Sequence, residues 1–129
     1  MLNGIEMTKH WEHLRTLALD EVEATLGALP GPLRERARQV AVILEPVPGA
    51  GLQADGIAED TLGLFVGPDF ADEEAVPMPP QIMLFLDNLW EQAERDEDLF
   101  VDEVCTTYLH ELGHYLGLDE EDLEDRGLE

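Results

Sequence analysis

Cysteine is almost absent from this sequence, in which Cys105 is the only one among 129 residues. One cysteine excludes an internal disulfide, and without a Cys-x-x-Cys pair the chain has no cysteine-based zinc site. Cys105 lies in an amphipathic segment, where a cysteine is more often a small buried apolar residue than a ligand. The scarcity of cysteine favours a protein of the reducing cytoplasm.

Basic residues are also scarce. The chain has 7 lysines and arginines against 30 aspartates and glutamates, for a formal net charge of -23 at pH 7. Such a charge repels nucleic acids and anionic membranes, so neither is expected as a partner. Near a binding site, the same acidity favours neutral or basic segments of a substrate.

Long apolar runs are missing as well. No stretch approaches the roughly 20 apolar residues that cross a bilayer, and residues 1–10 lack the basic start and apolar run of a secretory signal. The hydrophobic fraction of 44% is ordinary for a globular protein. We therefore expect one cytoplasmic domain, residues 1–129, with a modest core.

The spacing of apolar residues predicts an α+β fold with a small three- to four-stranded mixed sheet. A helix is expected over residues 7–29, ended by Pro30-Gly31-Pro32. Three apolar, largely β-branched or aromatic runs predict strands at residues 39–45, 61–66 and 81–86. The first of these runs has apolar residues on both faces of the strand, which indicates a central strand. Residues 46–60 are rich in Gly, Ala and Pro and are expected to form a loop.

Two helices are expected after the third strand. Asp87-Asn88 offers a cap for a short one. The second begins at Asp96-Glu97-Asp98, where an aspartate can cap and negative charge favours the helix dipole, and Gly117 is suited to end it. Its apolar residues recur with the period of a half-buried helix, at Val101, Val104, Cys105, Tyr108, Leu109, Leu112, Tyr115 and Leu116.

This last helix carries the pattern His-Glu-x-x-His, at His110, Glu111 and His114. Histidines spaced i, i+4 lie on one helix face a turn apart, so both imidazoles can reach one zinc ion. Glu111 is too close in sequence to be an easy third ligand, but it can contact a water at the metal as a general base.

A third protein ligand is expected just beyond the helix. A reversal of the chain at Gly117 can bring Glu120 back toward the histidines, and the neighbouring carboxylates of Asp119, Glu121, Asp122 and Glu124 stay as alternatives. Three protein ligands leave one coordination position open for water, which is typical of a catalytic rather than a structural zinc.

Four other features of the sequence give weaker evidence for a binding or catalytic site. His10 and His13 could form a second metal pair, but surface histidines are the simpler interpretation. Gly49-Ala50-Gly51 lacks the third glycine of a dinucleotide site, and the acidic residues 119–129 lack the order of a calcium loop. Tyr115 could stabilise an oxyanion, although a core or rim position is the simpler interpretation.

Residues 110–120 resemble the H-E-x-x-H-x-x-G-x-x-(acidic) signature of zincin metallopeptidases, and the short chain is similar to the small bacterial zincin-like proteins called minimal zincins. The resemblance implies zinc bound by His110, His114 and an acidic ligand at Glu120. It also implies peptide-bond hydrolysis by a metal-activated water with Glu111 as base. A strand near the cleft should then pair with an extended peptide or protein substrate, and residues 81–86 are the candidate.

The chain departs from the two large zincin classes. Metzincins have histidine or aspartate where Glu120 stands, and their methionine turn follows the motif, whereas all four methionines here precede it. Gluzincins place their glutamate farther downstream than this chain extends. The alternative to an enzyme is a zinc-stabilised acidic module that binds a basic partner without turnover.

Overall fold

The computed structural model describes residues 4–67 and 79–117. Its elements are α1 (Gly4–Ala28), α2 (Gly31–Ala37), β1 (Ala41–Glu45), α3 (Ala50–Ala54), β2 (Gly63–Val66), β3 (Gln81–Phe85), α4 (Leu86–Gln92) and α5 (Glu97–Tyr115). The strand order is β1-β3-β2, with β1 parallel and β2 antiparallel to β3. The predicted α+β class with a small mixed sheet is therefore confirmed, and the sheet has three strands within the described residues.

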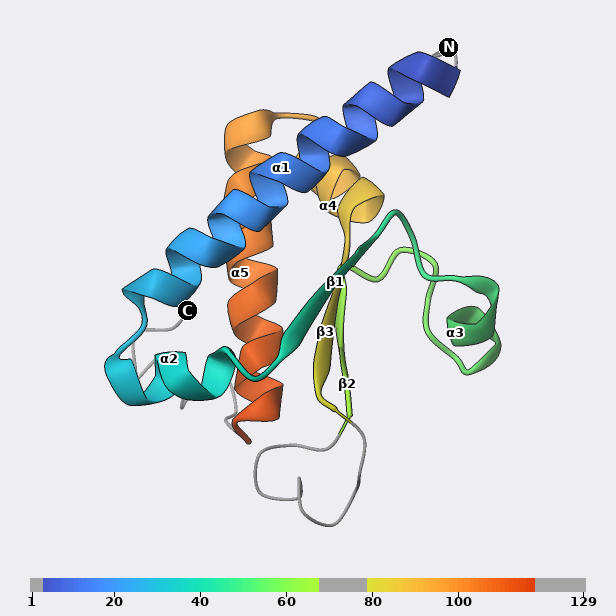
Figure 1. Cartoon of the computed structure of the whole chain (residues 1–129). Coiled ribbons are helices and arrows are strands. Elements are labelled where there is room, and N and C mark those ends of the chain that lie inside the picture. Colours follow the sequence, from blue (N-terminus) through green and yellow to red (C-terminus); the bar gives the residue numbers. More distant parts are fainter. Residues whose placement is uncertain (1–3, 68–78, 118–129) are drawn as a thin grey trace.

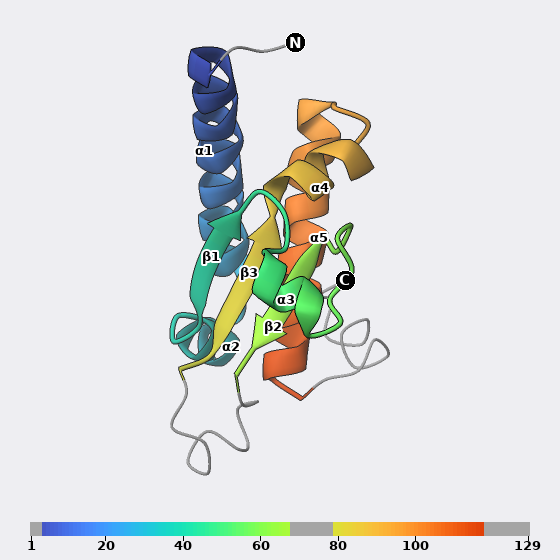
Figure 2. The same cartoon turned by 90° about the vertical axis from the view of Figure 1, so that its right-hand side faces the viewer.

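Helices α1 and α5 lie on one side of the sheet, and α3 lies on the other side (Figure 1). The view turned by 90° shows the three strands side by side in front of α5 (Figure 2). One apolar core lies between the sheet and helices α1 and α5. Its members include Leu14, Ala18, Val22 and Leu26 of α1, Ile82 and Leu84 of β3, and Phe100, Val104, Tyr108, Leu112 and Tyr115 of α5.

The spacing of these core residues explains why both long helices form. Within α1 and α5 they recur three or four residues apart, so each helix buries one stripe and leaves the other to solvent. Tyr108 is deep in this core, and its burial raises the pKa of its hydroxyl to about 12. Glu23 raises this pKa further and Arg38 opposes the rise. Within the described residues, no helix has the length and apolar character needed to cross a bilayer.

Both predicted ends of α5 are confirmed. The Asp96 side chain accepts a hydrogen bond from the Leu99 backbone N–H at 3.0 Å, which is an N-cap. At the other end, Gly117 has a φ of 72°, a left-handed conformation that glycine adopts without strain. These two residues fix the length of the helix that carries the site.

Replacing Asp96 with alanine removes the capping acceptor. We expect Asp96→Ala to lower the free energy of unfolding by about 1 kcal/mol, measured by urea denaturation. Asp96→Asn is the matched control, because its side-chain oxygen can accept the same hydrogen bond. Equal stability of the alanine and asparagine variants would show that the cap contributes nothing.

The position expected for the first strand is wrong. β1 is an edge strand whose ends, Ala41 and Glu45, are exposed, whereas β3 is central. A strand with apolar residues on both faces can lie at an edge when one of the faces packs on the core. Val42 and Leu44 contact the core, and Ile43 is only half-buried.

Two short helices and one cap also differ from expectation. The expected loop 46–60 contains α3, and α2 follows α1 directly, with Pro32 in its first turn, where a missing N–H costs nothing. Helix α4 has no side-chain cap. Asn88 instead donates hydrogen bonds to the backbone carbonyls of Glu59 (2.8 Å) and Thr61 (2.9 Å). This ties the chain entering β2 to α4.

Candidate metal centre

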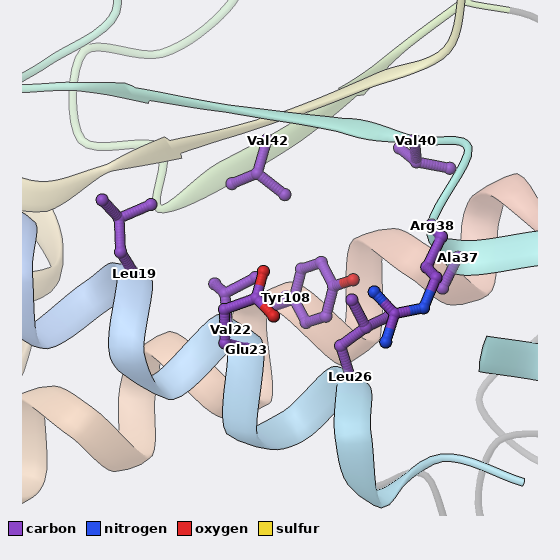
Figure 3. A pocket seen from close by; sticks show the side chains of 9 residues that line it. All are labelled: Leu19, Val22, Glu23, Leu26, Ala37, Arg38, Val40, Val42 and Tyr108. Atoms are coloured by element: carbon purple, nitrogen blue, oxygen red, sulfur yellow. The ribbon is translucent and has the colours of Figure 1, made fainter. Parts of the chain in front are cut away.

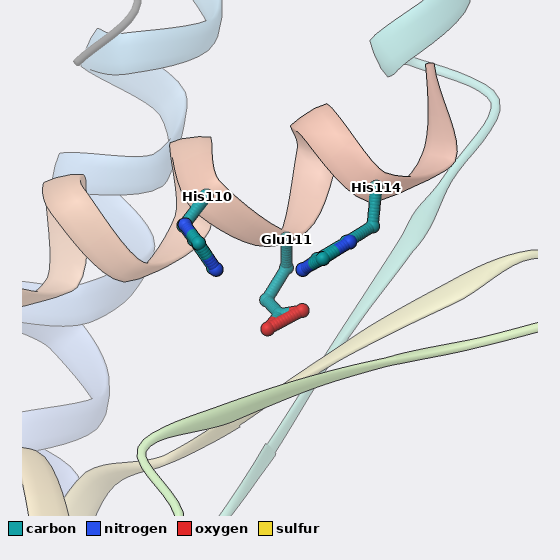
Figure 4. A group of neighbouring side chains, drawn as sticks. All are labelled: His110, Glu111 and His114. Atoms are coloured by element: carbon teal, nitrogen blue, oxygen red, sulfur yellow. The ribbon is translucent and has the colours of Figure 1, made fainter. Parts of the chain in front are cut away.

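Helix α5 brings His110, Glu111 and His114 together on the side that faces the strands (Figure 4). The two imidazole ring centres are 4.9 Å apart and the ring planes are at 87°. One nitrogen of each ring and one Glu111 carboxylate oxygen all lie within 4.8 Å of one another. His110 and Glu111 are partly buried and His114 is exposed. The i, i+4 spacing alone produces this convergence.

The donor set fits a zinc ion. Two imidazole nitrogens bound to zinc at about 2.0–2.1 Å with tetrahedral angles lie roughly 3.3 Å apart, which modest side-chain rotation can reach from the observed arrangement. In the part of the chain that the structure describes, no second group of three His, Cys, Asp or Glu side chains converges in this way. The arrangement therefore offers two imidazoles and one carboxylate to a single cation.

A pocket of about 250 Å³ adjoins these residues between β2 and α5. Its lining comprises Leu62, Gly63, Glu103, Thr106, Thr107, His110 and Glu111. Two of these residues, Glu103 and Glu111, carry carboxyl groups, and no lysine or arginine lines the pocket. The lining thus favours neutral or basic groups, as expected from the composition.

Gly63 of β2 lies close against α5. A Cβ atom on Gly63 would lie 2.5 Å from Thr107 Cγ2, 3.3 Å from the Met83 carbonyl oxygen and 3.4 Å from Glu111 Cγ. Only a residue without a side chain allows the strand to lie against Glu111. Gly63 was not predicted as a site residue, although a glycine inside a strand often marks a close approach of another segment to the backbone.

Two further predictions concerned the third metal ligand and Tyr115. Glu120 and the alternatives between Asp119 and Glu124 lie outside the described residues, so the third ligand stays a prediction. Tyr115 is fully buried and packs against Phe65, with ring centres 5.8 Å apart, which makes it a core residue.

The two histidines of α1 contact side chains other than each other. His13 is exposed and forms an ion pair with Glu97. The His10 ring lies edge-on to Trp90, with centres 5.5 Å apart. His10 and His13 therefore interact with different neighbours, on α4 and α5 respectively.

The strand expected to pair with a substrate is not available. Both edges of β3, residues 81–85, are hydrogen-bonded to neighbouring strands, β1 on one side and β2 on the other. The apolar character that marked this segment reflects its central position, with Ile82, Leu84 and Phe85 fully buried. The strand beside the His-Glu-His group is β2, which has one partner among the described strands.

Comparison with known proteins agrees with this geometry. The family model described as zincin-like metallopeptidase matches residues 37–128, which is more than half of the chain. The match begins just before β1 and includes α5 with its three converging side chains. No curated protein matches the chain.

Proposed function

Because the chain belongs to the zincin-like metallopeptidase family, we propose that it hydrolyses peptide bonds at a zinc ion. His110 and His114 are the proposed ligands on α5, and Glu120 is the proposed third ligand. The observation that carries the proposal is the convergence of both imidazoles and the Glu111 carboxylate beside a pocket. Family membership supports the same chemistry.

Glu111 is the proposed general base. Zinc, when bound, supplies a Lewis acid that lowers the pKa of water toward about 7. The Glu111 carboxylate lies within 4.8 Å of a nitrogen of each imidazole, and therefore close to the proposed position of the zinc ion. From there it can accept a proton from the attacking water and return it to the leaving amine. Its partial burial against Gly63 restricts its rotamers and keeps it directed at that position.

The proposed substrate is an extended peptide that pairs with β2 along the edge that has no strand partner among the described residues. Main-chain hydrogen bonds to a strand edge bind extended peptides with little dependence on sequence. Gly63 in β2 adjoins Glu111, so a peptide paired there passes the proposed base. Glu103 in the pocket favours neutral or basic side chains on that peptide.

Metal content tests the ligand assignment. We expect the purified chain to bind roughly one zinc ion and His110→Ala to lose it, measured by elemental analysis after equilibration with zinc. His13→Ala is the matched control, because His13 is an exposed histidine outside this group. Stoichiometric zinc in His110→Ala would overturn the assignment.

A hydroxamate inhibitor separates the enzyme from the non-catalytic module. A site with an open coordination position should bind the hydroxamate when loaded with zinc, whereas a site closed by four protein ligands should not. We expect binding to the zinc-loaded chain, measured by calorimetry. If the zinc-loaded protein does not bind the hydroxamate, the result would support the non-catalytic zinc-stabilised module instead.

A further inference from the structure

A second pocket lies on another side of α5 and shares no residue with the metal pocket. It has a volume of about 310 Å³ and opens between α1, β1 and α5 (Figure 3). We call it the Tyr108 pocket. Its lining comprises Leu19, Val22, Glu23, Leu26, Ala37, Arg38, Val40, Val42 and Tyr108.

Six of the nine residues that line the Tyr108 pocket are aliphatic, and they come from opposing elements. Leu19 and Leu26 extend from α1 toward β1, and Val42 extends from β1 back toward α1 (Figure 3). A pocket of this size, at the lower end of the range for ligand sites, holds a small molecule rather than a polymer. The apolar walls suit a compact aliphatic or aromatic group.

Three residues with polar groups, Glu23, Arg38 and Tyr108, complete the lining of the Tyr108 pocket. Tyr108 is only 1% exposed, and its hydroxyl points toward Arg38 (Figure 3). Exposed Glu23 and Arg38 carry opposite charges, and both act electrostatically on Tyr108. The ion pairs found among the described residues join His13 to Glu97 and Arg95 to Glu91, so neither Glu23 nor Arg38 has its charge neutralised by them.

The local charge differs from that of the whole chain. Three of the 7 basic residues, Arg34, Arg36 and Arg38, fall within residues 34–38, where Glu35 is the one acidic residue, although the net charge is -23. Of these, only Arg38 lines the pocket, and its guanidinium group can attract an anionic group. Glu23, on the facing helix α1, attracts a cationic group at the same pocket.

We propose that the Tyr108 pocket binds a free apolar α-amino acid. The ligand's carboxylate pairs with Arg38 and accepts a hydrogen bond from the Tyr108 hydroxyl. Its ammonium group pairs with Glu23, and its side chain occupies the apolar walls. A simple carboxylic acid leaves Glu23 without a partner, and a simple amine leaves Arg38 without one, so a zwitterion matches the pocket best.

Titration of the full chain with L-leucine tests this site. We expect leucine to shift the methyl NMR signals of Val22 and Val42 in a saturable manner. Two analogues are the ligand controls: 4-methylpentanoate lacks the amino group, and 3-methylbutylamine lacks the carboxylate. Each should bind at least about tenfold more weakly, because one charged hydrogen-bonded contact is lost. Absence of saturable shifts with leucine, or equal binding of either analogue, would overturn the proposal.

Surface variants test the assigned contacts. Arg38→Gln and Glu23→Gln should each weaken leucine binding by about tenfold or more. Arg34→Gln is the matched control, because it removes the same charge from the same segment without lining the pocket, and it should bind leucine nearly as well as the wild type. Unchanged binding in Arg38→Gln or in Glu23→Gln would contradict the assignment, and the methyl spectrum of each variant verifies its fold.

Discussion

Glu111→Gln is expected to reduce peptide hydrolysis by roughly 10²–10⁴-fold while zinc content stays near that of the wild type. Glutamine keeps the shape of the side chain but cannot accept the proton of the attacking water. The converging geometry places this carboxylate within 4.8 Å of a nitrogen of each imidazole, so no other described carboxylate is equally placed. Turnover of a fluorogenic peptide library and elemental analysis measure the two quantities.

The matched control for this prediction is Asp102→Asn. Asp102 lies on the same helix, is exposed and does not line the metal pocket, and its replacement removes the same unit of charge. It should retain activity within about twofold. Loss of zinc in Glu111→Gln would assign Glu111 as a ligand rather than a base, and retained hydrolysis would remove it from the chemistry.

Gly63→Ala is expected to destabilise the protein by about 1–3 kcal/mol and to reduce any activity at the adjoining site. The added methyl group would lie 2.5 Å from Thr107 Cγ2 and 3.3 Å from the Met83 carbonyl oxygen. The carbonyl belongs to the central strand and cannot move cheaply, so β2 and α5 must separate. That separation shifts Glu111, whose Cγ is the third contact at 3.4 Å. Urea denaturation and peptide turnover measure the two effects.

Two variants separate this clash from a general glycine effect. Thr107→Ser deletes Cγ2 and keeps the hydroxyl, so in the Gly63→Ala background it should restore much of the lost stability. Gly27→Ala adds a methyl group within α1 where nothing lies within 4 Å, and it should be neutral or slightly stabilising. Wild-type stability in Gly63→Ala, or a double variant no more stable than the single one, would refute the close-contact explanation.

Features that depend on neighbours along the chain could be predicted from the sequence. The period of apolar residues identified α1 and α5, because a helix places residues three and four apart on one face. Asp96 and Gly117 marked the ends of α5, because capping and left-handed termination are local backbone effects. The convergence of His110, Glu111 and His114 follows from the same helical geometry.

Features that depend on packing between distant segments needed the tertiary structure. The apolar runs of β1 and β3 are alike, so the sequence could not show which strand is central. The pairing places β3 in the centre of the described sheet and β2 at the edge beside the proposed base. Gly63 gained its importance from contact with Thr107, 44 positions away in the sequence. The Tyr108 pocket likewise joins α1, β1 and α5. Helical spacing is set by local backbone geometry, whereas strand order and pockets are set by which surfaces meet when the chain collapses.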